Sequence, residues 1–445
     1  MSNNLLAMIP GISPEWVAVG LLLLTYAAIM SERLNRAIVA LLGAVIMIGT
    51  GILTQSQAVD GIDFNTIGLL TGMMVIVSIS RKSGIFEYLA IWAAKLAKGS
   101  PAGVLAILVV VTAVVSALLD NVTTVLLIVP VTLIICQQLN VPAYPFLLSQ
   151  VLASNIGGTA TLIGDPPNIL IGTQVGLSFN QFVVNLTPVI LIVLAFHTMA
   201  IHLIWGRKLQ ATPEARARIM DMDERQAITD RTLLMKSLIV IMAVLLAFVG
   251  AHYVGLESGT IGMAGAALLL LLDNVGKSAE KQNESVRHVF NEIEWITLFF
   301  FIGLFIVVKG VEHTGVLQNL AGQLLKATGG DLKATGLGIL WSSAFLSAIV
   351  DNIPFVATMI PMVKAMAPSF GGPDGLMPLW WALSLGACLG GNGTLVGASA
   401  NLTVAGIAER NGISFRFLTY SKHALPMMIV PVSYTHLTLP TIYSV

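Results

Sequence analysis

Long apolar stretches separated by short polar ones recur along the whole chain. Clear examples are 16–30, 37–53 and 183–205. A helix needs about 20 predominantly apolar residues to cross the hydrocarbon core of a bilayer. The pattern therefore predicts an all-α polytopic membrane protein.

The order of these stretches predicts two similar halves. In the first half we expect spans and broken segments at 16–30, 37–54, 66–80, 85–98 (amphipathic), 102–119, 122–138, 143–175 (interrupted) and 183–205. In the second half we expect them at 233–252, 256–272, 295–308, 316–326 (amphipathic), 334–350, 353–367, 378–408 (interrupted) and from about 424. The predicted organisation is a first repeat (1–205), a polar cytoplasmic linker (206–232) and a second repeat (233–432). Residues 433–445 break the last apolar run, and we expect them to be a non-native tail.

Rare helix-breaking residues recur at a fixed spacing, which indicates internal duplication. Asp120-Asn121 and Asp351-Asn352 lie 231 residues apart, and Gly157-Gly158 and Gly390-Gly391 lie 233 residues apart. The two interrupted segments read NIGGTATLIGDPPN (155–168) and LGGNGTLVGASAN (389–401). Backbone at membrane depth leaves the helix only where protein or a water-filled cavity satisfies its polar groups. Paired interruptions in two repeats are typical of a transporter binding site.

Lys and Arg positions predict the topology, because these residues concentrate in cytoplasmic loops. If 102–138 is a re-entrant hairpin, each half crosses the membrane five times, so the second repeat is inverted. An outside N-terminus then places nineteen of the 23 Lys and Arg residues, Arg36 among them, on the cytoplasmic side. The interrupted segment 143–175 is the alternative re-entrant pair, since it gives the same parity.

Composition agrees with this class and excludes others. The chain is 56% hydrophobic and 10% charged, whereas soluble domains carry about 25% charged residues. The formal net charge is zero, which gives no basis for nucleic-acid binding. The two cysteines form no CxxC motif, and no cofactor is expected beyond a coupling ion.

Three carboxylates in apolar surroundings are the candidate chemical centre. Asp120, Asp165 and Asp351 each stand at a break in an apolar segment, and an ionised Asp at the bilayer centre costs about 2.5–3.5 kcal/mol on insertion scales. We predict that they exchange protons or bind a coupling Na⁺, while nearby amides and hydroxyls contact the solute. The predicted binding residues are Asp120, Asn121, Thr123, Asn155, Gly157, Gly158, Thr159, Thr161, Asp165, Asn168, Asp351, Asn352, Gly390, Gly391, Asn392, Thr394, Ser399 and Asn401. The possible sodium ligands are Asp120, Asn155, Asp351 and Asn392.

A simpler interpretation is that these side chains only cap broken helices. Asn352 is a good N-cap for the arm that follows it, and Asp165 can cap the half-helix that runs to Gly176. The two halves also differ, because Ala398 stands where the first repeat has Asp165. That asymmetry favours the first interrupted segment as the place of ion coupling.

Four motifs resemble the ion-transporter superfamily, in the group of arsenite-efflux permeases, NhaD-type sodium–proton antiporters and the melanosomal P-protein. They are SALLDNVTTVLLIVPVT (116–132), ASNIGGTATLIGDPPNI (153–169), SAIVDNIPF (347–355) and ACLGGNGTLVGASAN (387–401). The resemblance covers about 65–412. It implies two inverted repeats with re-entrant hairpins and unwound helices, a homodimer, and an elevator-like motion.

The expected function is therefore ion-coupled secondary transport across the cytoplasmic membrane. Arsenite or antimonite is the leading substrate, and sodium–proton antiport or transport of an organic anion such as citrate is the alternative. A passive channel and an intramembrane aspartyl protease are the other classes. The interpretation as a protease lacks support, because the sequence LIGD (162–165) does not match the GxGD motif of such enzymes.

Overall fold

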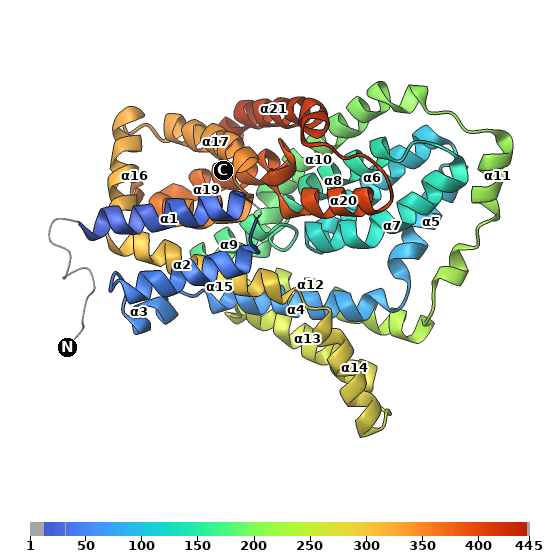
Figure 1. Ribbon diagram of the computed structural model, residues 1–445, viewed down its shortest axis with the longest axis horizontal. Coiled ribbons are helices and arrows are strands. Elements are labelled where there is room, and N and C mark those ends of the chain that lie inside the picture. Colours follow the sequence, from blue (N-terminus) through green and yellow to red (C-terminus); the bar gives the residue numbers. More distant parts are fainter. Residues whose placement is uncertain (1–12, 32, 443–445) are drawn as a thin grey trace.

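A computed structural model describes residues 13–31 and 33–442, and every element assigned in these residues is a helix (Figure 1). Seven of the described helices are long and apolar enough to cross a membrane. Large apolar side chains such as Leu24, Leu191 and Leu246 are more than half exposed. Such surfaces are suited to lipid, so the protein is a multi-pass membrane protein, as the apolar pattern predicted.

The described helices follow the predicted order. The first half contains α1 (Pro14–Met30), α2 (Arg36–Gly49), α3 (Gln55–Asp60), α4 (Phe64–Arg81), α5 (Ile85–Leu96), α6 (Pro101–Leu118), α7 (Asn121–Leu139), α8 (Tyr144–Gly158), α9 (Pro166–Val175) and α10 (Phe179–Ile204). The short helix α11 (Pro213–Asp221) lies in the polar linker. The second half contains α12 (Arg231–Val254), α13 (Ser258–Asn274), α14 (Ala279–Asn291), α15 (Trp295–His313), α16 (Val316–Ala327), α17 (Leu332–Ile349), α18 (Asn352–Lys364), α19 (Met377–Gly390), α20 (Ser399–Arg410) and α21 (Phe417–Ile442).

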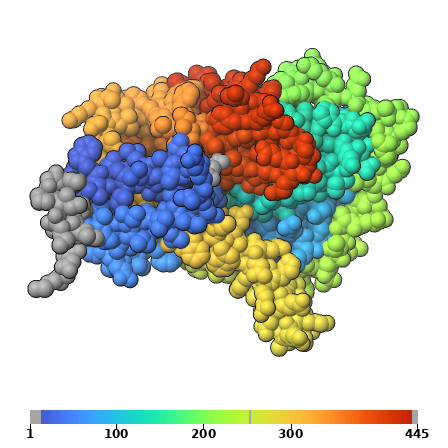
Figure 2. All heavy atoms as spheres, in the orientation of Figure 1, coloured from blue at the N-terminus to red at the C-terminus, as the bar shows by residue number. Residues whose placement is uncertain are grey.

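Some details differ from the sequence prediction. Helices α3, α11 and α14 fall in segments for which we predicted no helix, and α14 projects from the rest of the molecule (Figures 1 and 2). Helix α21 begins at Phe417 rather than near 424, and it continues through the predicted start of the tail at 433. The polar surface of α14 explains why an apolar pattern did not reveal it.

Helices α2, α4, α13 and α15 form one packed group, which we call the crossed core. In it α4 packs against α13 and α15 packs against α2, so each contact joins the two repeats. Glycines allow the close approach, because a Cβ at Gly72 would lie 2.4 Å from the backbone of Gly262, and one at Gly303 would lie 2.5 Å from that of Ala40. Small residues serve this purpose at membrane helix interfaces.

Helices α6 and α7 form a re-entrant hairpin whose two ends lie on the same side. The loop before α6 contacts the linker, with Gly99 against Arg216. At the end of α7, the guanidinium of Arg218 donates a 2.7 Å hydrogen bond to the carbonyl of Gln138. We call this side of the molecule the linker face.

Helices α8 and α9 together cross the membrane as one interrupted span. Tyr144, at the start of α8, packs its ring against Trp205 beside the linker. Near the end of α9, the carbonyl of Gln174 accepts a 2.8 Å hydrogen bond from Lys364 on the opposite face. The hairpin is therefore 102–138, as preferred from the sequence, and not 143–175.

The second repeat is inverted relative to the first. Its hairpin, α17 and α18, ends at Lys364 on the opposite face, whereas α20 ends at Arg410 beside Gln137 of α7 on the linker face. Each hairpin packs against the first half of its own interrupted span, α6 against α8 and α17 against α19. The two broken regions consequently meet in the middle of the molecule.

We predict that Gly157→Ala lowers the free energy of unfolding by about 1–3 kcal/mol, as expected for overpacking. A Cβ at this position would lie 2.1 Å from the carbonyl oxygen of Ala113. Thermal unfolding in detergent is the measurement. Gly20→Ala is the matched control, because nothing lies within 4 Å of a Cβ there. Equal melting temperatures for the two variants would contradict the packing described.

Candidate functional site

Hydroxyl groups fasten each hairpin to its interrupted span in the same way in both repeats. Ser116 Oγ donates to the carbonyl of Ser154 at 2.7 Å, and Ser347 Oγ donates to that of Ala387 at 2.7 Å. The predicted residues Thr161 and Thr394 donate to hairpin carbonyls at 2.6 and 2.5 Å. Their hydroxyls therefore hold the hairpin tips in place.

Two asparagines satisfy the unwound backbone. Asn168 Nδ2 donates to the carbonyls of Thr159 and Thr161 at 3.0 and 2.9 Å. Asn401 Nδ2 donates to those of Gly391 and Thr394, both at 2.8 Å. Since an unpaired carbonyl at membrane depth is costly, these amides stabilise the interruption of each span.

The predicted glycines lie where the backbone is crowded. Gly157 and Gly390 contact the hairpins at Ala113 and Ala344. Gly158 and Gly391 lie against the far ends of their unwound segments, where an added Cβ would be 2.4 Å from the Gly164 carbonyl oxygen and 3.0 Å from that of Gly397. Both pairs serve close packing.

A cluster of buried amides joins the two repeats at the centre. Asn155 Nδ2 donates to Asn392 Oδ1 at 2.8 Å and to Asn401 Oδ1 at 3.0 Å. Asn121 Nδ2, at the tip of the first hairpin, donates to Asn155 Oδ1 at 2.9 Å. Thr159 Oγ1 donates to the carbonyl of Asn155 at 2.7 Å. The structure thus brings these predicted residues together, although they lie up to 246 residues apart.

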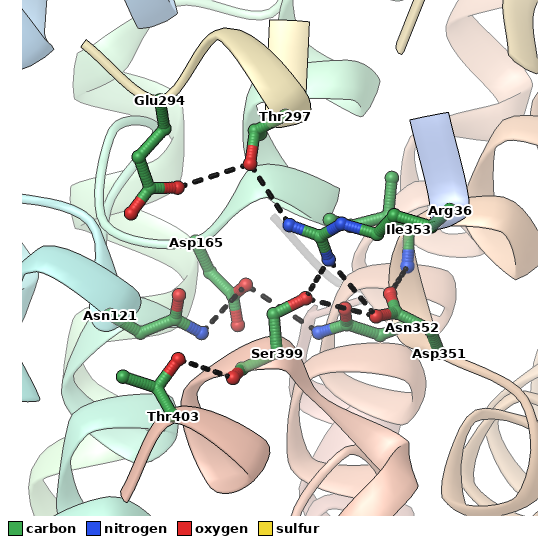
Figure 3. A network of polar contacts seen from close by, with 10 residues as sticks. All are labelled: Arg36, Asn121, Asp165, Glu294, Thr297, Asp351, Asn352, Ile353, Ser399 and Thr403. Carbon is green, nitrogen blue, oxygen red and sulfur yellow. Dashed lines mark hydrogen bonds and ion pairs between the residues drawn. The ribbon is translucent and has the colours of Figure 1, made fainter. Parts of the chain in front are cut away.

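Asp165 lies fully buried between the tips of both hairpins (Figure 3). Its Oδ1 accepts hydrogen bonds from Asn121 Nδ2 at 3.2 Å and from Asn352 Nδ2 at 3.5 Å. The thiol of Cys388 also interacts with this carboxyl group. Its Oδ2 accepts no hydrogen bond from a nitrogen or oxygen donor of the residues described. The prediction that Asp165 caps α9 is wrong, because no side-chain cap bond forms and the carboxylate faces the hairpin tips.

Asp120 and Asp351 are the N-caps of the second hairpin arms. Asp120 Oδ1 accepts from the backbone N–H of Thr123 at 2.8 Å, and the Thr123 hydroxyl donates to Oδ2. Asp351 Oδ1 accepts from the N–H of Ile353 at 3.0 Å. The prediction that Asn352 caps α18 is wrong, since Asp351 occupies that position and frees the Asn352 amide to reach Asp165.

Arg36 and Glu294 belong to the same network but were not predicted as site residues (Figure 3). Arg36 Nη1 donates to Ser399 Oγ, and Nη2 donates to Thr297 Oγ1 at 2.9 Å. Thr297 Oγ1 lies 3.0 Å from Glu294 Oε2, to which it donates. Glu294 could have been found, because it lies 231 residues after Asp63, the N-cap of α4. Arg36 gave no such signal, because it is the first residue of α2 and its guanidinium reaches Ser399 and Thr297 from there.

Two cavities adjoin this network. A cavity of about 20 Å³ lies between Asp120, Asn121, Asp165, Asn352 and neighbouring residues. A wider one of about 570 Å³ is lined by α15, α20 and the start of α2. Arg36, Val122, Glu294, Thr297 and Ser399 line both. The central carboxylates therefore lie next to a space large enough for a small solute.

Inverted repeats, paired re-entrant hairpins and interrupted helices that meet at a buried carboxylate define a secondary transporter. Residues 26–386 match the model of the CitMHS family, which is described as citrate transporter. The chain belongs to this family, within the ion-transporter superfamily. Since this is a family of transporters, the protein is not an enzyme, and the protease alternative is set aside.

Known relatives agree with this assignment. An uncharacterized transporter of Mycobacterium tuberculosis is 42% identical over 421 residues, covering 94% of this chain and 96% of that protein. The P protein of Homo sapiens is 32% identical over 497 residues, covering 93% of this chain and 58% of that protein. The crystal structure of the YdaH transporter of Alcanivorax borkumensis has a TM-score of 0.56 at 14% identity, covering 97% of each chain. The resemblance to the P-protein group is confirmed.

We predict that Asn168→Ala destabilises the first unwound segment. The variant leaves two buried carbonyls without donors, at a cost of about 1–3 kcal/mol. Hydrogen exchange of residues 159–165 should accelerate, and the melting temperature in detergent should fall. Asn180→Ala is the matched control, because that amide bonds to a single carbonyl at an exposed position. Unchanged exchange at 159–165 would show that the Asn168 amide does not hold this segment.

Proposed function

We propose that this protein couples the movement of a small organic anion across the cytoplasmic membrane to a proton or sodium gradient. One observation carries the proposal. Asp165 is buried between the tips of two inverted hairpins, and its Oδ2 has no nitrogen or oxygen donor among the residues described. A buried carboxylate oxygen left open in this way suits a proton or a small cation, because an unpaired charge at this depth is costly.

The small central cavity supports a single coupling ion. Asn121 Oδ1 is a second buried acceptor without a partner in the described part of the chain, and both residues line this cavity. A volume of about 20 Å³ is enough for one water-sized particle, for which ~10–15 Å³ suffices. Oxygen ligands suit Na⁺, and a proton on Asp165 would equally remove the unpaired charge.

The wider cavity supports an anionic solute. Its volume of about 570 Å³ falls in the range of small-molecule sites, roughly 300–1,000 Å³. Arg36 lines it, and guanidinium groups recognise carboxylates. The description of the matched family as citrate transporter points the same way. The competing substrates are arsenite or antimonite, and Na⁺ exchanged for H⁺.

The proposed motion is alternating access in a homodimer. The crossed core joins the repeats through close backbone contacts, so it suits a fixed scaffold. The hairpins and interrupted spans are fastened to each other by side-chain bonds to backbone carbonyls, so they suit a unit that moves as one. We call this unit the mobile body. A rigid-body displacement of it would expose the site to each side in turn.

Gradient-driven uptake into proteoliposomes tests the function, with citrate, arsenite, sodium and chloride as substrates. We expect saturable citrate uptake that an imposed proton or sodium gradient accelerates. Asp165→Asn should reduce this acceleration by roughly tenfold or more, because the neutral amide cannot carry the coupling charge. Asp374→Asn, at an exposed position in the short 3-10 helix Pro373–Leu376, should behave as wild type. If arsenite is the only substrate taken up, arsenite replaces citrate as the proposed solute. If Asp165→Asn still shows gradient-dependent citrate uptake, the proposed coupling role of Asp165 is refuted.

We further propose that the linker face is cytoplasmic, which places the N-terminus outside. Both cysteines are buried, so single exposed cysteines can report the topology. In intact spheroplasts, a membrane-impermeant maleimide should label Ser369→Cys on the opposite face and leave Gln210→Cys in the linker unlabelled until the membrane is permeabilised. The reverse labelling pattern would invert the assignment.

A further inference from the structure

Arg36 is the one cation among the residues that line both cavities, all of which are described in the structure. Four carboxylates surround it or lie close by, namely Asp120, Asp165, Glu294 and Asp351. An anion could enter such surroundings only where a positive group offsets the repulsion. Binding of any anionic solute in these cavities would therefore depend on the positive charge of Arg36.

The guanidinium of Arg36 connects two parts of the molecule that the proposed motion would separate. On one side is the crossed core, which contains Arg36 itself on α2 and also Thr297 and Phe300 on α15. The Phe300 ring lies 5.2 Å from the guanidinium carbon, and Thr297 Oγ1 accepts from Nη2. Ser399 and Asp351, on the other side, belong to the interrupted span and hairpin of the second repeat, within the mobile body.

The contact between Arg36 and Asp351 is loose. Arg36 Nη1 lies 3.8 Å from Asp351 Oδ2, and the hydroxyl of Ser399 stands between them, donating to Oδ2 at 3.0 Å. A direct guanidinium–carboxylate pair is frequently bidentate, with bonds of about 2.7–2.9 Å. The side chain of Arg36 is also 26% exposed. Arg36 is thus oriented by the crossed core and only lightly engaged by Asp351.

We propose that Arg36 binds the carboxylate of the transported solute, and that Asp351 is the internal anion that the solute displaces. The inference rests on the proposed function, since it names the group that recognises the anion. Asp351 and the solute compete for one guanidinium in this arrangement. A cation or proton that neutralises Asp351 would therefore favour anion binding, which links the two ligands through a single residue.

Glu294 does not enter this competition in the same way. It reaches Arg36 through Thr297 on the same helix end, so it stays with Arg36 when the mobile body moves. Its contribution is to hold the guanidinium fork in position. The displaced partner has to be on the mobile body, and Asp351 is the acidic residue there that forms an ion pair with Arg36 in the described residues.

Citrate binding by the purified full-length protein in detergent, followed by isothermal titration calorimetry, tests the proposal. Arg36→Met should raise the dissociation constant roughly tenfold or more, as expected for loss of a charge-assisted hydrogen bond. Arg36→Lys keeps the charge but loses the planar fork, so its value should lie between those of wild type and Arg36→Met. Arg33→Met is the matched control, because Arg33 is exposed three residues earlier.

The distinguishing result is the opposite effect of Asp351→Asn. Removal of the competing carboxylate should lower the dissociation constant for citrate several-fold. The double variant should bind as weakly as Arg36→Met. Melting temperatures close to that of wild type would confirm that each variant is folded.

The outcomes separate the inference from the function on which it rests. Wild-type protein that neither binds nor transports an organic anion would overturn the proposed substrate class, and this inference with it. Wild-type protein that binds citrate, together with an unchanged dissociation constant in folded Arg36→Met, would overturn the inference alone. Weaker binding in Asp351→Asn would also overturn it, because a merely structural ion pair predicts that both single variants lose affinity.

Discussion

Satisfaction of the unwound backbone inside the membrane is the constraint on which the rest of this structure depends. Two spans leave the helix at depth, and each exposed carbonyl needs a donor that lipid cannot supply. Asn168 and Asn401 supply these donors in equivalent positions. Hydroxyls from the hairpins and unwound segments complete the arrangement. The hairpins, the glycines and the central amides can all be understood as the surroundings that such an interruption requires.

Polar groups that satisfy backbone also arrange the charges. Asp120 and Asp351 are used as caps, and this leaves the amides of Asn121 and Asn352 directed at Asp165. The three acids are therefore not equivalent, although their sequence contexts look alike. Asp165 is the acid without a capping bond to its own helix, and Asp351 is the one within reach of an arginine. This difference is the basis for the proposed division of roles between the coupling ion and the solute.

The sequence predicted most of the fold because breaks in apolar segments are rare and recur at a constant spacing. The paired interruptions at Gly157-Gly158 and Gly390-Gly391, and the hairpin tips at Asp120 and Asp351, were all located correctly. Side-chain direction was less accessible, so the cap was assigned to Asn352 instead of Asp351. Arg36 was missed because its partner Ser399 lies 363 residues away. A long side chain at a helix start gives no periodic signal that distinguishes a loop position from a binding site.

The difference between Asp165 and Ala398 has an electrical consequence. If the mobile body crosses the membrane field with Asp165 ionised, it carries one negative charge that the neutral Ala398 of the second repeat does not duplicate. One elementary charge moved through the full field corresponds to about 2.3 kcal/mol per 100 mV. An inside-negative membrane potential would then drive the empty mobile body towards the outer side. With a proton or Na⁺ on Asp165 the contribution of this carboxylate disappears, so its occupancy would change how strongly voltage acts on the loaded and on the empty mobile body.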